Sequence, residues 1–315
     1  SQTETNNWLF GNNAHLNFSN DQINVFNQSK LTSFQGSSSI SDKKGDLLFY
    51  TNGQFVWNKN HQRMVGSNGF SLIGDDIGTQ TSLIVPIPES NTLFYIFTIK
   101  TPAQDGSNSD NEGLYYSIVD TSLNNGLGMM TQMNVPLIKN VIGKISGVHQ
   151  KYGNDIRVVV NGKKNQDDLY NDLFFSFLVK PNTIERPVIS DNGKLFFSDS
   201  VGQMKLSPNG EKLGYAANNS GAFIFDFDST TGLASNPERL SMSTAPGDLT
   251  FPYGVEFTND SRYIFFDVSD SSGKSRLCQF DLFAKRNGAE HELPAPFLFS
   301  GKPALSPQSE VKQTG

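Results

Sequence analysis

Few residues of this 315-residue chain have the types and spacing that chemistry requires, and they are scattered. The four histidines are His15, His61, His149 and His291, and no two of them have the spacing of zinc ligands in a motif such as HExxH. A single cysteine, Cys278, excludes both an internal disulfide and a CxxC site. The sequence therefore predicts no metal site, and we expect no cofactor.

Paired carboxylates are the next candidates, because they can carry out acid–base catalysis or bind Ca²⁺. The pairs are Asp75–Asp76, Asp167–Asp168 and Asp226/Asp228. The last pair would share one face of a strand, but it belongs to a recurring pattern of Asp, polar turn and Gly that favours a turn. The first pair lies in a glycine-flanked loop before a predicted strand, so it could reach the mouth of a central channel. A structural Ca²⁺ remains an alternative for these carboxylates.

Motifs for nucleophilic catalysis and for phosphate binding are absent from the sequence. No GxSxG elbow occurs, and the glycine loop at residues 66–69 lacks the lysine and the helix of a P-loop. Aromatic side chains could stack on sugars, and the candidates are Trp8, Trp57, Tyr115 and Tyr152. A polysaccharide-binding or polysaccharide-processing site at the channel mouth would require Asp75, Asp76, His149 and Tyr152 to converge.

The hairpin at residues 39–58 is the clearest structural element of the chain. A short strand ending at Ile40 is followed by a turn at residues 42–45, an apolar strand at residues 47–50 and the dipeptide Asn52-Gly53. Asn-Gly between apolar runs predicts a type I′ turn, in which both central residues have positive φ. The third strand is then expected at residues 54–57.

Variants of this hairpin recur along the chain, starting at Ile40, Ile84, Val148, Leu206 and Phe257. The spacing is close to the period of roughly 40–50 residues that is typical of propeller blades, with loop insertions lengthening the middle blades. We predict an all-β fold: a single β-propeller domain at residues 1–315 with six to seven four-stranded blades. The predicted repeats are 37–66, 80–140, 144–190, 202–243 and 252–298.

The two ends of the chain are expected to share a closing blade. Residues 302–307 resemble a first strand, and three strands predicted at residues 8–10, 15–18 and 23–26 would supply the other three. Such sharing removes the free sheet edge. The closing blade would therefore contain residues 1–36 and 301–315.

The composition favours a β-rich protein and argues against nucleic-acid binding. Hydrophobic residues make up 36% and charged residues 18% of the chain, while phenylalanine is common at 25 residues, a mixture that suits short strands joined by polar turns. The net charge of −6 and the absence of a basic stripe argue against nucleic-acid binding. No stretch approaches the roughly 18 apolar residues of a transmembrane helix. Cys278 lies between alternating apolar residues and is expected to be a buried, inert thiol.

An ordered set of segments carries a resemblance to a known family. The segments include NNWLFGNNAHLNF, ISDKKGDLLFYTNG, QTSLIVPIPESNTLFYIFT, MKLSPNGEKLGYA and YGVEFTNDSRYIFF, and the set covers residues 8–266. Together they resemble the β-propeller module of envelope and secreted proteins in gliding-type bacteria that use type IX secretion. Many of those relatives continue into a C-terminal sorting domain, which is not seen here.

This resemblance implies an exported, non-enzymatic interaction protein in the periplasm or at the outer membrane, with its signal peptide removed. The implied partner is an outer-membrane secretion or gliding component, and one such role would be to dock on the translocon and seal it from the periplasmic side. The contact loops expected from the repeat are residues 67–80, 101–113 and 163–172. The candidate contact residues in them are Asp75, Asp76, Gln104, Asp105, Asp167, Asp168 and Tyr170.

Overall fold

The computed structural model describes residues 2–19, 22–66, 71–102, 111–196, 200–242 and 250–283, and the backbone of residues 297–300. These residues form an all-β structure, as predicted from the composition. The 3₁₀ turn η1 (Gln2–Thr5) and the four-residue α1 (Leu123–Gly126) are the helical segments within the described part of the chain.

The strands form antiparallel sheets that follow one another along the chain. The first sheet contains β1 (Asn7–Phe10), β2 (Ala14–Ser19) and β3 (Gln22–Phe26), and the second contains β4 (Ser38–Ser41), β5 (Leu47–Thr51) and β6 (Val56–Asn58). The third contains β7 (Ser82–Pro86), β8 (Leu93–Lys100), β9 (Gly113–Asp120) and β10 (Met129–Ile138). The fourth contains β11 (Val141–His149), β12 (Ile156–Gly162) and β13 (Leu173–Lys180), with β14 (Thr183–Ile184) and β15 (Val188–Asp191) both paired to β13.

Two further sheets complete the described structure. The fifth contains β16 (Met204–Leu206), β17 (Lys212–Ala217), β18 (Gly221–Asp228) and β19 (Leu233–Leu240). The sixth contains β20 (Thr250–Phe257), β21 (Tyr263–Asp270), β22 (Ser275–Asp281) and β23 (Phe297–Ser300).

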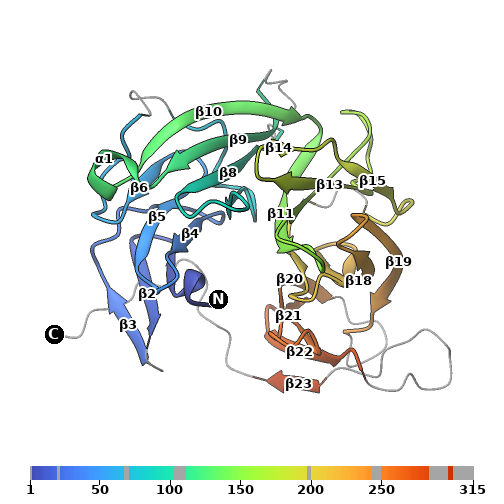
Figure 1. Ribbon diagram of the computed structural model, residues 1–315. Coiled ribbons are helices and arrows are strands. Elements are labelled where there is room, and N and C mark those ends of the chain that lie inside the picture. Colours follow the sequence, from blue (N-terminus) through green and yellow to red (C-terminus); the bar gives the residue numbers. More distant parts are fainter. Residues whose placement is uncertain are drawn as a thin grey trace.

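The sheets are arranged around a common centre, with the first strand of most sheets innermost (Figure 1). Strand β4 contacts β7, β7 contacts β11, β11 contacts β16 and β16 contacts β20. This succession of meander sheets joined at their first strands is the arrangement of a β-propeller. No ladder of hydrogen bonds joins the sixth sheet to the first among the described residues, so the number of blades and the closure of the ring stay predictions.

The hydrophobic core lies between neighbouring sheets, because alternate residues of a strand point to opposite faces. On β7, Ile84 packs with Phe49 and Phe94 toward the second sheet, whereas Val85 packs with Val158 toward the fourth. The third sheet is therefore apolar on both faces, and phenylalanine side chains such as Phe49, Phe94 and Phe97 fill the spaces beside it. Cys278 is buried in the same way, and burial raises the pKa of its thiol to about 11, as expected for an inert cysteine.

The hairpin at residues 39–58 forms, but its second turn differs from the prediction. Positive φ occurs at Gly53 (88°) and not at Asn52, so the turn is not type I′. The Asn52 side chain is the physical reason: its Oδ1 accepts hydrogen bonds from the N–H groups of Gln54 (3.0 Å) and Phe55 (2.9 Å). This side-chain cap lengthens the turn, and the third strand begins at Val56 rather than at residue 54.

Candidate partner-binding face

The described parts of the predicted contact loops come together on one face of the propeller, which we call the loop face. They surround a cavity of about 280 Å³ at the start of β11. The first loop contributes Ile77, Gly78 and Thr79, the second contributes Thr101 and Pro102, and the third contributes Lys163, Asp168, Leu169 and Asn171. Residues more than 90 positions apart in the sequence therefore share one concave surface.

Aliphatic side chains are exposed at the edge of this cavity. Ile77 is 51% exposed, Leu169 is 58% exposed and Val201 is 40% exposed, and all three line the cavity. They come from three separate loops of the chain. Exposed aliphatic residues that cluster in this way are typical of sites that bind another protein. The sequence reasoning missed these residues because it looked for charged groups, and each is a lone aliphatic residue in a polar loop.

Asp75 has a structural role in the loop face. Its carboxylate is 3% exposed. Oδ1 accepts a hydrogen bond from the N–H of Gly78 (3.1 Å), and Oδ2 accepts from the N–H (2.8 Å) and the hydroxyl (2.6 Å) of Thr101. These bonds tie the first contact loop to the end of β8. The carboxylate therefore shapes the site from within and is not presented to a partner.

The segment that follows Asp75 reaches across the centre of the disc. The N–H of Gln80 donates to the carbonyl of Gly143 on β11 (2.8 Å), and the hydroxyl of Thr79 accepts from the N–H of Gly202 (3.3 Å), just before β16. Contacts to two other sheets hold this segment in place. A partner would thus meet a rigid surface, which lowers the entropic cost of binding.

The remaining predicted contact residues fall into three groups. Asp76 is half-buried, and its main-chain carbonyl accepts from the N–H of Gln35 (3.0 Å). Asp168 stabilises its own turn, because its Oδ2 accepts from the N–H of Asn165 (2.8 Å), while Asp167 is exposed and Tyr170 is half-buried. Gln104 and Asp105 lie outside the described residues.

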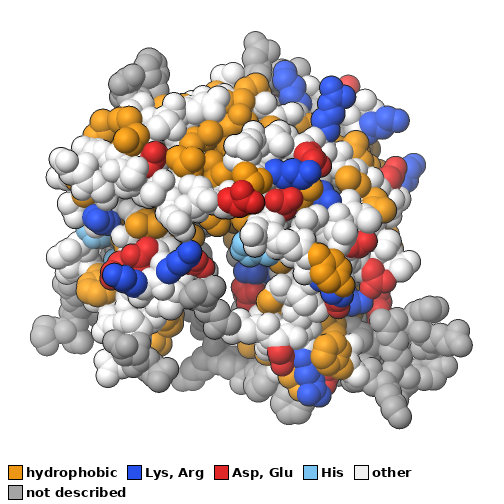
Figure 2. Space-filling model, viewed as in Figure 1, with side chains coloured by type: hydrophobic (Ala, Val, Ile, Leu, Met, Phe, Trp, Pro, Cys, Tyr) orange, Lys and Arg blue, Asp and Glu red, His pale blue; other side chains and the backbone are white. Residues whose placement is uncertain are grey.

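A larger cavity, of about 690 Å³, opens at the opposite end of the central strands. Figure 2 shows a hollow near the centre of this second face. The aliphatic residues Leu83, Val85 and Val148 line it, and His149 is also among the lining residues. His149 ends β11, roughly 25 Å from the strand's first residue at the loop face. Hence Asp75 and Asp76 do not converge with His149.

The aromatic candidates for sugar stacking do not gather either. Trp57 is 6% exposed and stacks on Tyr50, with ring centroids 5.4 Å apart, and Tyr115 is 7% exposed. Trp8 and Tyr152 are exposed, but they lie on the first sheet and on the turn after β11, respectively. No aromatic platform forms from these four residues.

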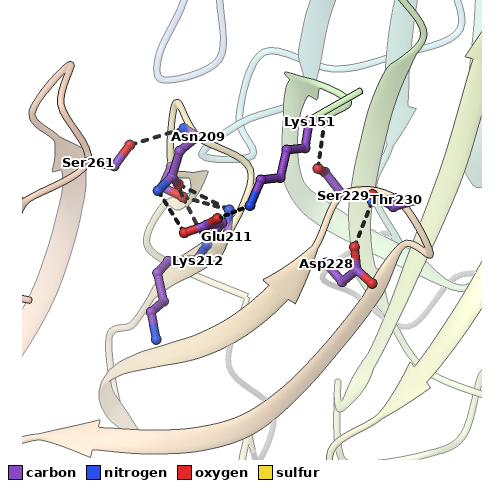
Figure 3. A network of polar contacts seen from close by, with 9 residues as sticks. Lys151, Asn209, Glu211, Lys212, Asp228, Ser229, Thr230 and Ser261 are labelled. Atoms are coloured by element: carbon purple, nitrogen blue, oxygen red, sulfur yellow. Dashed lines mark hydrogen bonds and ion pairs between the residues drawn. The ribbon is translucent and has the colours of Figure 1, made fainter. Parts of the chain in front are cut away.

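Polar ties connect the sheets on the second face (Figure 3). Lys151, after β11, pairs with Glu211 of the β16–β17 turn (2.6 Å), and its N–H donates to the hydroxyl of Ser229 (3.0 Å). In the same network the N–H of Asn209 donates to the hydroxyl of Ser261, in the β20–β21 turn (3.0 Å). The short turns of the second face thus bond to one another.

Among the described residues, no group of three or more His, Cys, Asp and Glu side chains is placed to hold a metal ion together. Within the same residues, no helix has the length and apolar character needed to cross a membrane.

Comparisons with known proteins find solved structures with a similar fold, but they do not assign the chain to a family. No family profile matches the chain, and no curated protein matches its sequence. A putative TolB from Agrobacterium tumefaciens is 12% identical, with 89% of this chain and 86% of that one covered and a TM-score of 0.41. A hypothetical selenium-binding protein from Sulfolobus tokodaii is 11% identical, with 92% and 73% covered and a TM-score of 0.49. A gluconolactonase from Xanthomonas campestris is 13% identical, with 81% and 75% covered and a TM-score of 0.41. At these values the similarities say nothing about activity or partner.

Proposed function

We propose that this chain is a non-enzymatic interaction module of the bacterial cell envelope, which binds an outer-membrane component of type IX secretion through its loop face. The observation that carries the binding part of the proposal is the convergence of the contact loops around one cavity, with Ile77, Leu169 and Val201 exposed at its edge. The link to type IX secretion rests on the ordered sequence segments that resemble that family.

The chemistry of the loop face suits a protein partner. Its exposed aliphatic side chains would be buried on binding, at roughly 25 cal/mol for each Å² of apolar surface removed from water. Polar groups such as Lys163 and Asp168 line the same cavity and would form part of the polar rim. The mechanism would be steric: a rigid disc presents one face to a larger membrane protein and obstructs or positions it.

The proposal includes closure of the disc by both ends of the chain, as a ring of six blades. At the start of β1, the hydroxyl of Thr3 donates to the carbonyl of Lys43 on the second face (2.9 Å). At its end, the carbonyl of Gly11 accepts from the N–H of Ser33 (2.9 Å), close to where Gln35 bonds to Asp76. Strand β1 thus runs from the second face to the loop face. Strand β5, which is the second strand of its own sheet, runs in the same direction.

A first strand is therefore the missing member of the first sheet. Strand β1 is the terminal strand of that sheet among the described residues. Among the described residues, the carbonyls of Asn7 and Leu9 accept from side-chain hydroxyls, those of Ser39 (2.6 Å) and Ser37 (3.0 Å), and no further strand pairs with β1 beyond β2. Since β23 pairs with β22 as a fourth strand, the chain that follows it, residues 301–315, is next in order and would pair with β1.

Site-specific photo-cross-linking tests the proposed binding face. A photoreactive amino acid is placed at Ile77 or Leu169, with Tyr152 on the second face as the control because it is also well exposed (71%). The variants are expressed in a bacterium that has the type IX pathway, and the products are identified by mass spectrometry. We expect positions 77 and 169 to cross-link to the same outer-membrane secretion protein and position 152 not to.

Two outcomes would overturn the proposal in different ways. Cross-linking to that protein from position 152 but not from 77 or 169 would show that the wrong face was chosen. Cross-links from 77 and 169 to a protein unrelated to secretion would refute the type IX assignment. As a quantitative check, Leu169→Asp should reduce recovery of the partner at least tenfold, whereas Tyr152→Asp should not, with both variants keeping the wild-type melting temperature.

A further inference from the structure

Two histidines that are 46 positions apart in the sequence face each other between the first two sheets. His15 lies on β2, and His61 lies in the turn after β6, with their ring centroids 6.0 Å apart. Both rings line a cavity of about 310 Å³, together with Gln28, Asp46 and Lys59. Its lining residues differ from those of the loop-face cavity and of the larger cavity on the second face.

The hydrogen bonds around His15 determine which of its nitrogens carries the proton. The Nδ2 group of Asn7 donates to the carbonyl of Gly45 (2.9 Å), which can only accept, so the amide orientation of Asn7 is fixed. Its Oδ1 must then accept from Nε2 of His15 (2.8 Å). In the neutral ring, Nδ1 of His15 is therefore an unprotonated nitrogen with a free lone pair.

That nitrogen is buried and has no partner among the described residues. The His15 side chain is only 6% exposed. A buried acceptor without a partner costs roughly 1–3 kcal/mol, which makes it an exception that calls for an explanation. A metal ion bound to Nδ1 would remove this cost, and the Nε2–H···O bond to Asn7 is the outer contact that metal-binding histidines usually make.

His61 is held in a similar way. Its Nδ1 lies 3.1 Å from the hydroxyl of Tyr50, which also accepts from the N–H of Lys30 (3.1 Å). Its backbone has a φ of 60°, which is uncommon outside glycine. For Nε2 of His61 to be the second ligand atom, Nδ1 must carry the proton and donate to the Tyr50 hydroxyl, and this contact orients the ring.

The surroundings of both imidazoles favour the neutral form, which is the form that binds metals. Burial lowers the pKa of His15, and the neighbouring His61 lowers it further. Burial also lowers the pKa of His61, with a further contribution from Lys30. A lowered pKa means that protons compete less with a metal ion for these nitrogens at neutral pH, while burial and the charge of Lys30 oppose any cation at the site.

The separation of the rings fits a shared ion. With a metal–nitrogen distance of about 2.0–2.1 Å, two imidazoles on one ion have ring centroids roughly 5.2 Å apart at a tetrahedral angle and roughly 6.4 Å apart when they lie opposite each other, and the observed 6.0 Å lies between these values. We propose that His15 and His61 bind one transition-metal ion of the Zn²⁺, Ni²⁺ or Cu²⁺ class, with water molecules completing its coordination. Because both protein ligands are imidazole nitrogens, the site favours transition metals over Ca²⁺ and Mg²⁺, which prefer oxygen ligands.

Such an ion would connect two sheets that share a small apolar interface. The first sheet packs on the second through a cluster made of Leu9, Leu31, Tyr50 and Trp57. The metal would add a bond between β2 and the turn after β6. It would therefore stabilise the docking of the first sheet.

The test uses the full chain without an affinity tag, and its readouts are ¹⁵N NMR of the imidazoles and calorimetric titration with ZnCl₂ or NiCl₂. Only four histidines are present, so single variants assign every signal. Before metal is added, His15 should be protonated on Nε2. We expect one equivalent of Zn²⁺ to shift the signals of His15 and His61 but not those of His149, and to raise the melting temperature.

Matched variants complete the test. His15→Gln and His61→Gln should each weaken binding at least tenfold and remove the thermal shift, while His149→Gln should keep both. The proposal is overturned if millimolar Zn²⁺, Ni²⁺ or Cu²⁺ leaves the His15 and His61 signals unchanged. It is equally overturned if the His15→Gln/His61→Gln double variant binds as tightly as wild type. The NMR readout on the wild-type chain keeps the test valid even if a variant folds poorly.

Discussion

The side-chain amide of Gln80 forms two hydrogen bonds with the main chain of Met204, a residue 124 positions later in the chain. Nε2 donates to the carbonyl oxygen (3.0 Å), and Oε1 accepts from the N–H (2.7 Å). Met204 begins β16, the innermost strand of the fifth sheet. The amide therefore takes the place of a neighbouring strand at this edge and fastens the first contact loop across the centre of the disc.

Replacing Gln80 with Glu should destabilise the fold. A carboxylate can still accept from the N–H of Met204, but it cannot donate to the carbonyl and would repel it. We expect a loss of about 1–3 kcal/mol in the free energy of unfolding, measured by urea denaturation. The matched control is Gln62→Glu, because Gln62 is exposed, and it should change stability by less than about 0.5 kcal/mol. Equal effects of the two variants would contradict the role given to Gln80.

The adjacent carboxylates Asp75 and Asp76 should respond differently to the same change. Asp75→Asn would turn one of the two acceptor atoms that bond to Gly78 and Thr101 into a donor. We expect a loss of about 1–3 kcal/mol and faster amide hydrogen exchange at Thr101. Asp76→Asn, at a half-buried residue, should be nearly neutral. If Asp75→Asn left both stability and exchange unchanged, the carboxylate would be free for another role.

The pKa of His15 makes stability depend on pH. Above its ordinary value of 6.5, the histidine is neutral in both the folded and unfolded states. As the pH falls below 6.5, the unfolded chain binds the proton first, because the folded-state pKa is lowered, so the free energy of unfolding decreases. Wild type should therefore lose more stability than His15→Gln between pH 8 and pH 5.5, measured by urea denaturation with EDTA present. Parallel pH profiles would contradict a lowered pKa.

Strands were predictable from the sequence where apolar residues gather between turn residues. The strand predicted at residues 8–10 is β1 (Asn7–Phe10), and the one predicted at residues 47–50 is β5 (Leu47–Thr51). The Asn52 turn was not predictable, because the Asn52 side chain bonds to the N–H groups that a type I′ turn would leave to the main chain. A dipeptide rule takes no account of such a side-chain bond.

The candidate sites were less predictable, because they depend on contacts between distant residues. The contact loops could be located as insertions between repeats, but nothing local distinguishes Leu169 as an exposed residue at a cavity edge. His15 and His61 lack metal-ligand spacing and meet only because the first and second sheets pack together. The role of Asp75 depends likewise on Thr101, 26 positions later.

Removal of residues 301–315 tests the closure of the disc by a shared blade. If these residues pair with β1, a chain that ends at Ser300 should have a lower melting temperature and faster hydrogen exchange at the amides of Asn7 and Leu9, which lie on the terminal strand of the first sheet. Removal of residues 311–315 alone is the control and should have a smaller effect, because a first strand such as β4 needs only about four residues. If the chain ending at Ser300 kept the wild-type melting temperature and exchange rates, the first sheet would owe its stability to the second sheet alone, through the cluster around Tyr50 and Trp57.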